Sequence, residues 1–81
     1  MKAQEHKRID REFELFTLRH FEKPRKCKNL EQVRFYVQEL VEKIEDFKHR
    51  FDYVPEAAYQ LLAQYNTIQN SMVFEEFKKT Y

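Results

Sequence analysis

The feature that most constrains the fold of this chain is a series of apolar residues at helical spacing between positions 30 and 51. Steps of three and four residues place one apolar side chain per turn on a single face of a helix. The positions between them are almost all charged or polar. The stripe consists of Leu30, Val33, Val37, Leu40, Ile44, Phe47 and Phe51. This pattern predicts an amphipathic helix over residues 30–51, about 33 Å long at the usual rise per residue.

Residues 3–22 predict another helix, which carries two apolar stripes instead of one. The first stripe is Ile9, Phe13 and Phe16, and the nearly opposite one is Leu15, Leu18 and Phe21. Because a surface helix of a compact monomer needs only one such stripe, this helix is expected to offer its second side to another element or another chain. The aromatic content of residues 13–21 also suits a strand. No other segment could pair with such a strand in the same chain, so a helix is favoured.

Residues 54–70 predict a third helix, and its apolar stripe drifts beyond Asn70 and Ser71. The stripe consists of Val54, Ala58, Leu61, Leu62, Tyr65, Ile68 and Met72. The drift indicates either a bend or a short fourth helix over residues 71–80, with Asn70 or Ser71 as its cap. Residues 1–81 together are expected to form a single helical domain.

The connections between these helices contain recognisable start and stop signals. Pro24 ends the first helix, because proline pushes the preceding residue out of the helical region. Asn29, followed three residues later by Gln32, is a good N-cap for the second helix. Asp52 is expected to cap the third helix, with Pro55 in its first turn. Short connections make neighbouring helices antiparallel. We therefore predict an all-α, antiparallel three-helix bundle, with the option of a short fourth C-terminal helix.

The composition excludes several classes of function. The chain has no glycine, so it has neither a phosphate-binding loop nor a dinucleotide-binding turn. Cys27 is the only cysteine, which rules out an internal disulfide and a thiolate zinc site. A lone thiol suits a reducing compartment, and the polar N-terminus does not resemble a signal peptide. No apolar run approaches the ~20 residues that span a bilayer. We expect a cytoplasmic protein without cofactor, metal or membrane contact.

No arrangement of residues points to catalysis. The carboxylates of residues 30–51 fall on the solvent side of the predicted helix, beside cations, so we expect them to be solvated surface groups. His20 prolongs the stripe of the first helix and is expected to be partly buried. Glu45 and His49 are four residues apart, but no third metal ligand is placed by the sequence. Cys27 and His20 lack a third group that would orient them as nucleophile and base. We predict that the protein is not an enzyme.

A basic stretch supplies one of two functional hypotheses. Residues 1–28 hold nine cations and five acids, for a net charge of +4, whereas residues 29–81 have a net charge of −3. Five of the cations fall within ten residues: Arg19, Lys23, Arg25, Lys26 and Lys28. Loops of this kind contact phosphates well. A nucleic-acid-binding accessory protein is therefore the alternative hypothesis, although no helix-turn-helix pattern supports it.

The leading hypothesis rests on a surplus of large apolar residues. The eight phenylalanines and five tyrosines exceed what one three-helix core needs, and exposed groups of this kind mark interfaces. Phe35 projects opposite the stripe of its helix and is expected to be exposed, and Tyr59 belongs to the same surplus. The predicted interaction residues are Leu15, Leu18, Phe21, Phe35, Phe74, Phe77 and Tyr81. We predict a small non-enzymatic regulator or adaptor that forms a homodimer through the first helix and the C-terminal aromatic residues.

Overall fold

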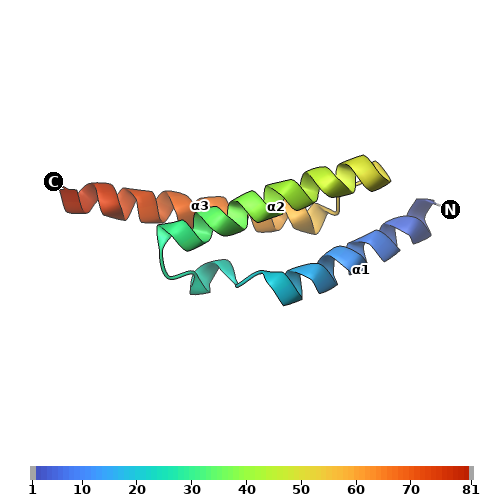
Figure 1. The fold of residues 1–81 in the computed structure, drawn as a ribbon, viewed down its shortest axis with the longest axis horizontal. Helices are drawn as coiled ribbons and strands as arrows, with labels where there is room; N and C mark the ends of the chain where they lie inside the picture. The colour runs from blue at the N-terminus through green and yellow to red at the C-terminus, as the bar shows by residue number, and fades with distance from the viewer. Residues whose placement is uncertain (1, 81) are drawn as a thin grey trace.

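The structure, a computed structural model, describes residues 2–80 and builds them from three α-helices and one short 3-10 turn (Figure 1). The elements are α1 (Lys2–His20), η1 (Pro24–Lys26), α2 (Leu30–Phe51) and α3 (Glu56–Thr80). α2 and α3 run antiparallel and make the main helix contact, and α1 lies along one side of this pair. The predicted all-α three-helix architecture is confirmed. Residues 13–20 are helical, so the alternative of a strand there is wrong.

The first two helix boundaries follow the signals in the sequence. α1 ends before Pro24, and Lys23 is extended with φ −62° and ψ 138°. The side-chain oxygen of Asn29 accepts a hydrogen bond of 2.8 Å from the backbone N–H of Gln32. The side chain of Gln32 in turn accepts one of 2.8 Å from the backbone N–H of Lys28. The predicted N-cap of α2 is therefore confirmed, and two N–H groups without helical partners are satisfied.

The predicted role of Asp52 is wrong. Asp52 is the C-cap of α2: it adopts the left-handed conformation with φ 52°, and its N–H donates to the carbonyl of Lys48 over 2.9 Å. Helices often end on a glycine in this conformation, and aspartate is among the few other residues that tolerate it. In a chain without glycine, Asp52 takes that place. α3 then begins at Glu56, after a buried Pro55 whose carbonyl accepts the N–H of Ala58.

The short fourth helix expected over residues 71–80 does not form separately, because α3 continues without interruption from Glu56 to Thr80. The drift of the apolar stripe marks the place where α3 leaves the rest of the molecule. Beyond Met72, described side chains up to Lys78 are exposed, and Figure 1 shows this end projecting past α2. The Cα radius of gyration is 14.8 Å, whereas a compact chain of this length would have about 12 Å. The molecule is elongated.

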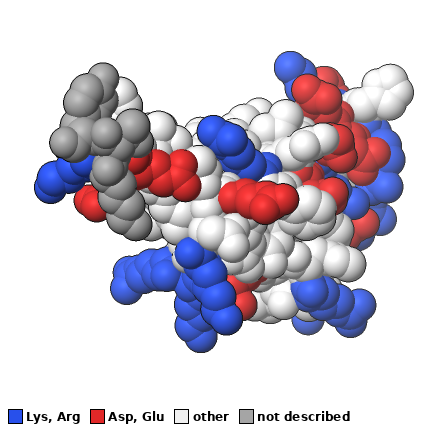
Figure 2. Space-filling model, turned by 60° about the vertical axis from the view of Figure 1, so that its left-hand side comes forward, with Lys and Arg blue, Asp and Glu red and all other residues white. Residues whose placement is uncertain are grey.

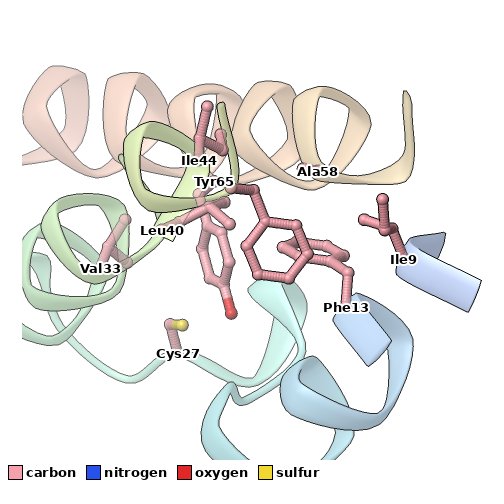
Figure 3. Close-up of a cluster of buried hydrophobic side chains, with 9 residues drawn as sticks. Ile9, Phe13, Cys27, Val33, Leu40, Ile44, Ala58 and Tyr65 are labelled. Carbon is pink, nitrogen blue, oxygen red and sulfur yellow. The ribbon is translucent and has the colours of Figure 1, made fainter. Parts of the chain in front are cut away.

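The core lies where α2 and α3 meet the inner side of α1 and the loop that follows it (Figure 3). Its buried residues are Ile9, Phe13, Cys27, Val33, Leu40, Ile44, Phe47, Ala58 and Tyr65. Four of them belong to the predicted stripe of α2, which is thereby confirmed. The Tyr65 side chain extends from α3 across the core, and its hydroxyl donates to the backbone carbonyl of Glu22. One side chain therefore ties α3 to the loop after α1.

A small set of long side chains holds α1 against the other two helices. The rings of Phe13 and Phe47 meet edge to face at 5.7 Å between centroids, and the Lys43 ammonium lies 4.4 Å from the centre of the Phe16 ring. In the middle of α1, the side chain of Asp10 accepts a hydrogen bond of 2.7 Å from the Tyr53 hydroxyl. These contacts involve the inner side of α1, and its outer side is left to solvent.

Candidate interaction surface

The outer side of α1 exposes the second apolar stripe that the sequence contains. The side chain of Leu18 is 75% exposed and that of Leu15 is 49% exposed. Phe21 behaves differently, because the helix ends at His20 and the chain turns back toward the core. The Phe21 ring is half-buried against Phe16, Tyr36 and Tyr65, at centroid distances of 5.5, 5.7 and 6.2 Å. The structure thus gives Phe21 a role inside the monomer and leaves two leucines on the outer face.

The C-terminal part of α3 carries the second group of exposed apolar side chains. Phe74 is 62% exposed, Phe77 is 61% exposed and Val73 is 41% exposed. This group lies on the segment that projects beyond α2, in the half of the molecule away from α1 (Figure 1). The prediction for Tyr81 falls outside the described residues. The two apolar surfaces predicted as one interface are therefore separate patches on a single chain.

Three other large apolar residues lie at the surface away from these patches. Phe35 on α2 is 59% exposed, as the sequence predicts, and its ring edge contacts Tyr36 with a centroid distance of 5.7 Å. Tyr59 on α3 is 52% exposed, and Val41 on α2 is 36% exposed. Val41 and Val73 are therefore exposed apolar residues that the predicted interaction surface does not include.

A signal in the sequence could have identified α3 as the exposed, uncharged helix. Residues 57–74 contain no Asp, Glu, Lys, Arg or His, although 36% of the chain is charged. The polar positions of this segment are filled by Gln, Asn, Thr, Ser and Tyr. Most of them are exposed in the structure. The buried centres of protein interfaces are depleted of charged residues and enriched in aromatic residues. The outer side of α3 has this composition.

The molecule exposes more surface than a compact chain of its mass. Its accessible area is 6697 Å² for 10.1 kDa, whereas a folded monomer of that mass exposes about 5,300 Å². The excess is therefore about 1,400 Å² per chain. It follows from the elongated shape and from the projecting end of α3.

The chemistry expected of an active site does not assemble in the part of the chain that the structure describes. The Cys27 thiol is buried, donates to the Lys23 carbonyl over 3.8 Å, and has a raised pKa because of desolvation and, second, the nearby Glu22 carboxylate. His20 is exposed rather than partly buried, which corrects the prediction. Its ring lies against the Phe16 ring, with 4.5 Å between the two ring centroids, and does not enter the core.

Among residues 2–80, no three His, Cys, Asp or Glu side chains gather closely enough to hold a metal ion. Over the same described range, no helix is both long enough and apolar enough to cross a membrane. A groove of about 480 Å³ separates α1 from α3 and is lined by Asp10, Glu14, Tyr53 and Gln60, among others. The pKa of Tyr53 is raised, first by its hydrogen bond to Asp10. The groove is open to solvent, so it offers no desolvated pocket for catalysis.

The basic stretch is open to solvent. Lys23, Arg25 and Lys26 line a groove of about 840 Å³ between η1 and α3. Arg19 lies in the last turn of α1, and Lys28 is exposed just before α2. None of the salt bridges in the described part of the chain involves these five cations. On the face shown in Figure 2, lysine and arginine side chains project along the lower edge, and other residues separate the groups at its left and right ends.

The sequence matches no protein-family model, and it has no significant similarity to a curated protein or to a solved structure. The inference of function therefore depends on the geometry described above.

Proposed function

We propose that this protein is a small non-enzymatic interaction module, a regulator or adaptor, that associates with a second copy of itself. The observation that carries the proposal is the surface excess of about 1,400 Å² per chain relative to a compact monomer. A stable interface of standard size removes about 800 Å² from each partner. The exposed apolar side chains on α1 and on the projecting end of α3 supply the area that such an interface would cover.

Self-association would also stabilise the elongated fold. Among the described side chains, the buried hydrophobic core comprises nine residues, and α1 is attached by a few side-chain contacts. Anything that binds the folded state and not the unfolded state stabilises the fold by mass action. A second copy would therefore reinforce an elongated bundle that buries little surface by itself.

The test is the mass of the protein in solution, measured by sedimentation equilibrium at low and at high salt. We expect a dimer whose dissociation constant changes little with salt, because apolar burial is not screened as charge pairs are. A monomer at tens of micromolar in both buffers would overturn the proposal.

Replacing Leu18 by aspartate tests the outer side of α1. Because Leu18 is 75% exposed and lies away from the core, Leu18→Asp should leave the helix content of the monomer unchanged. If α1 takes part in the interface, the buried carboxylate weakens association, since an unpaired charge is costly to bury. Gln38→Asp is the matched control, because it places the same charge on an exposed position of α2. Equal dissociation constants for the two variants would show that Leu18 on α1 lies outside the interface.

The alternative function, contact with nucleic acid, is supported by the unpaired and exposed cations around η1. It predicts binding that weakens steeply with salt, because each neutralised phosphate releases a counterion. Arg25→Glu combined with Lys26→Glu should abolish such binding without changing the oligomeric state that sedimentation measures. A flat titration of the unmodified protein with duplex and single-stranded nucleic acid at low salt would exclude this function.

A cytoplasmic location is part of the proposal. The support for it is the single Cys27, whose thiol is free and buried in the core.

A further inference from the structure

α3 carries a second series of residues at coiled-coil spacing, separate from the side that packs on the core. The steps between them alternate between four and three residues, which is the heptad pattern of a helix that pairs with another helix. All six are exposed in the structure. We call them the outer seam: Tyr59, Ala63, Asn66, Asn70, Val73 and Phe77. The seam lies within and just beyond the uncharged segment, so a partner helix would meet no charge along most of its length.

The outer seam is arranged symmetrically about Ile68. Tyr59 and Phe77 are aromatic residues equally far from this centre, and Asn66 and Asn70 are a pair of amides on either side of it. The remaining two members, Ala63 and Val73, are likewise equally far from it. A two-fold axis perpendicular to a helix pairs each position with its mirror position in the second copy.

We infer that the outer seam is the self-association surface, and that α3 pairs with α3 of a second copy in the antiparallel direction. This inference rests on the self-association proposed above and specifies its surface and direction. The outer seam contains the two kinds of core position of a heptad, a and d. Each layer of the antiparallel pair joins an a position of one helix to a d position of the other, as antiparallel packing requires. The layers are Tyr59 with Phe77, Ala63 with Val73, and Asn66 with Asn70.

The sizes of the side chains favour this direction over the parallel one. A parallel pair would place Ala63 against Ala63 beside a layer of two tyrosines, which leaves a gap next to a bulky layer. The antiparallel pair joins the small alanine to the larger Val73. Phe74, which flanks the seam and is 62% exposed, then lies toward the small Ala63 of the other copy. The central amides hydrogen-bond each other, and buried polar residues of this kind fix the register of paired helices.

The shape of the molecule favours the same direction. In Figure 1, α2 runs alongside the N-terminal part of α3, α1 lies to one side at the same end of the molecule, and the C-terminal part of α3 projects alone. Antiparallel pairing lays each projecting end along the N-terminal part of the other α3. It therefore brings the C-terminal aromatic residues of one copy to the end of the other copy that holds α1. Parallel pairing would let the projecting ends cover only each other.

The experiment is site-directed disulfide cross-linking between Ala63→Cys and Val73→Cys, each in a Cys27→Ala background so that it carries one thiol. The two variants carry tags of different mass, and oxidised glutathione is the oxidant. In the antiparallel pair the two cysteines face each other across the interface, so the mixture should form a hetero-disulfide. Each variant oxidised by itself should form several-fold less cross-linked dimer. Circular dichroism of each variant checks that the helices are intact.

Each outcome separates this inference from the proposal on which it depends. Homo-disulfides of each variant that exceed the hetero-disulfide would show parallel pairing and overturn the inferred direction. A dimer in sedimentation without any of these disulfides would overturn the outer seam and leave self-association intact. A monomer in sedimentation would overturn both the self-association proposal and the outer seam as its surface. In addition, Asn66→Leu with Asn70→Leu should associate about tenfold more tightly or better and lose its preference for the hetero-disulfide, since the amides set register at a cost in affinity.

Discussion

Replacing Phe74 by alanine measures how much the projecting end of α3 contributes to association. The ring is 62% exposed, which leaves about 120 Å² of a side chain that can bury roughly 200 Å². If the second copy covers half of that area, the ring contributes about 1.5 kcal/mol at 25 cal/mol per Å². The two rings of a dimer together contribute about 3 kcal/mol, so Phe74→Ala should raise the dissociation constant of the dimer about 100-fold.

The assay is sedimentation equilibrium over a range of concentrations, with circular dichroism to follow helix content. Because Phe74 is exposed and lies outside the core, the helix content of the variant monomer should match the unmodified chain. Gln38→Asp again serves as the control for substitution at an exposed position. A Phe74→Ala protein with the dissociation constant of the unmodified chain would refute the argument, because it would show that the other copy leaves this ring in water.

Three further predictions concern the monomer fold. Asn29→Ala removes the side-chain acceptor of the Gln32 N–H, so we expect a loss of about 1 kcal/mol and a melting temperature lower by roughly 4–8 °C. Leu40→Ala empties a fully buried site and should cost 2–5 kcal/mol in chemical denaturation, far more than Phe35→Ala, whose ring is 59% exposed. Burial raises the pKa of Tyr65 and of Cys27 above their ordinary values of 10.0 and 9.0. The folded state therefore holds these protons longer than the unfolded state, so stability is full below about pH 9 and falls as the pH rises above it. Melting temperatures that stay constant up to strongly alkaline pH would contradict this last prediction.

The helices themselves could be predicted from the sequence because their signals are local. The spacing of the α2 stripe, the Asn29 cap and Pro24 act within one or two helical turns, and all three are confirmed. Asp52 was misassigned because the same residue type suits both a helix start and a left-handed helix end. In the structure Asp52 ends α2, and α3 begins only at Glu56, four residues later.

The candidate surface could be predicted only in part. The exposure of Leu18 follows from its position opposite the core stripe of α1, and it was expected. Phe21 has the same spacing, but the helix ends one residue before it, and its ring enters an aromatic group with Tyr36 and Tyr65. That group assembles from three elements far apart in the sequence, so periodicity within one segment does not reveal it.

The amino-acid sequence by itself determined that this chain is helical, where α2 begins and ends, and which side of α2 is buried, because hydrogen bonds and side-chain spacing within a helix depend on near neighbours. Only the tertiary structure decided that α3 runs unbroken past Asn70 and projects from the bundle. It also decided that the apolar surfaces of α1 and α3 are separate on one chain. Both depend on how far each helix extends beyond the elements packed against it, which is a relation between distant segments.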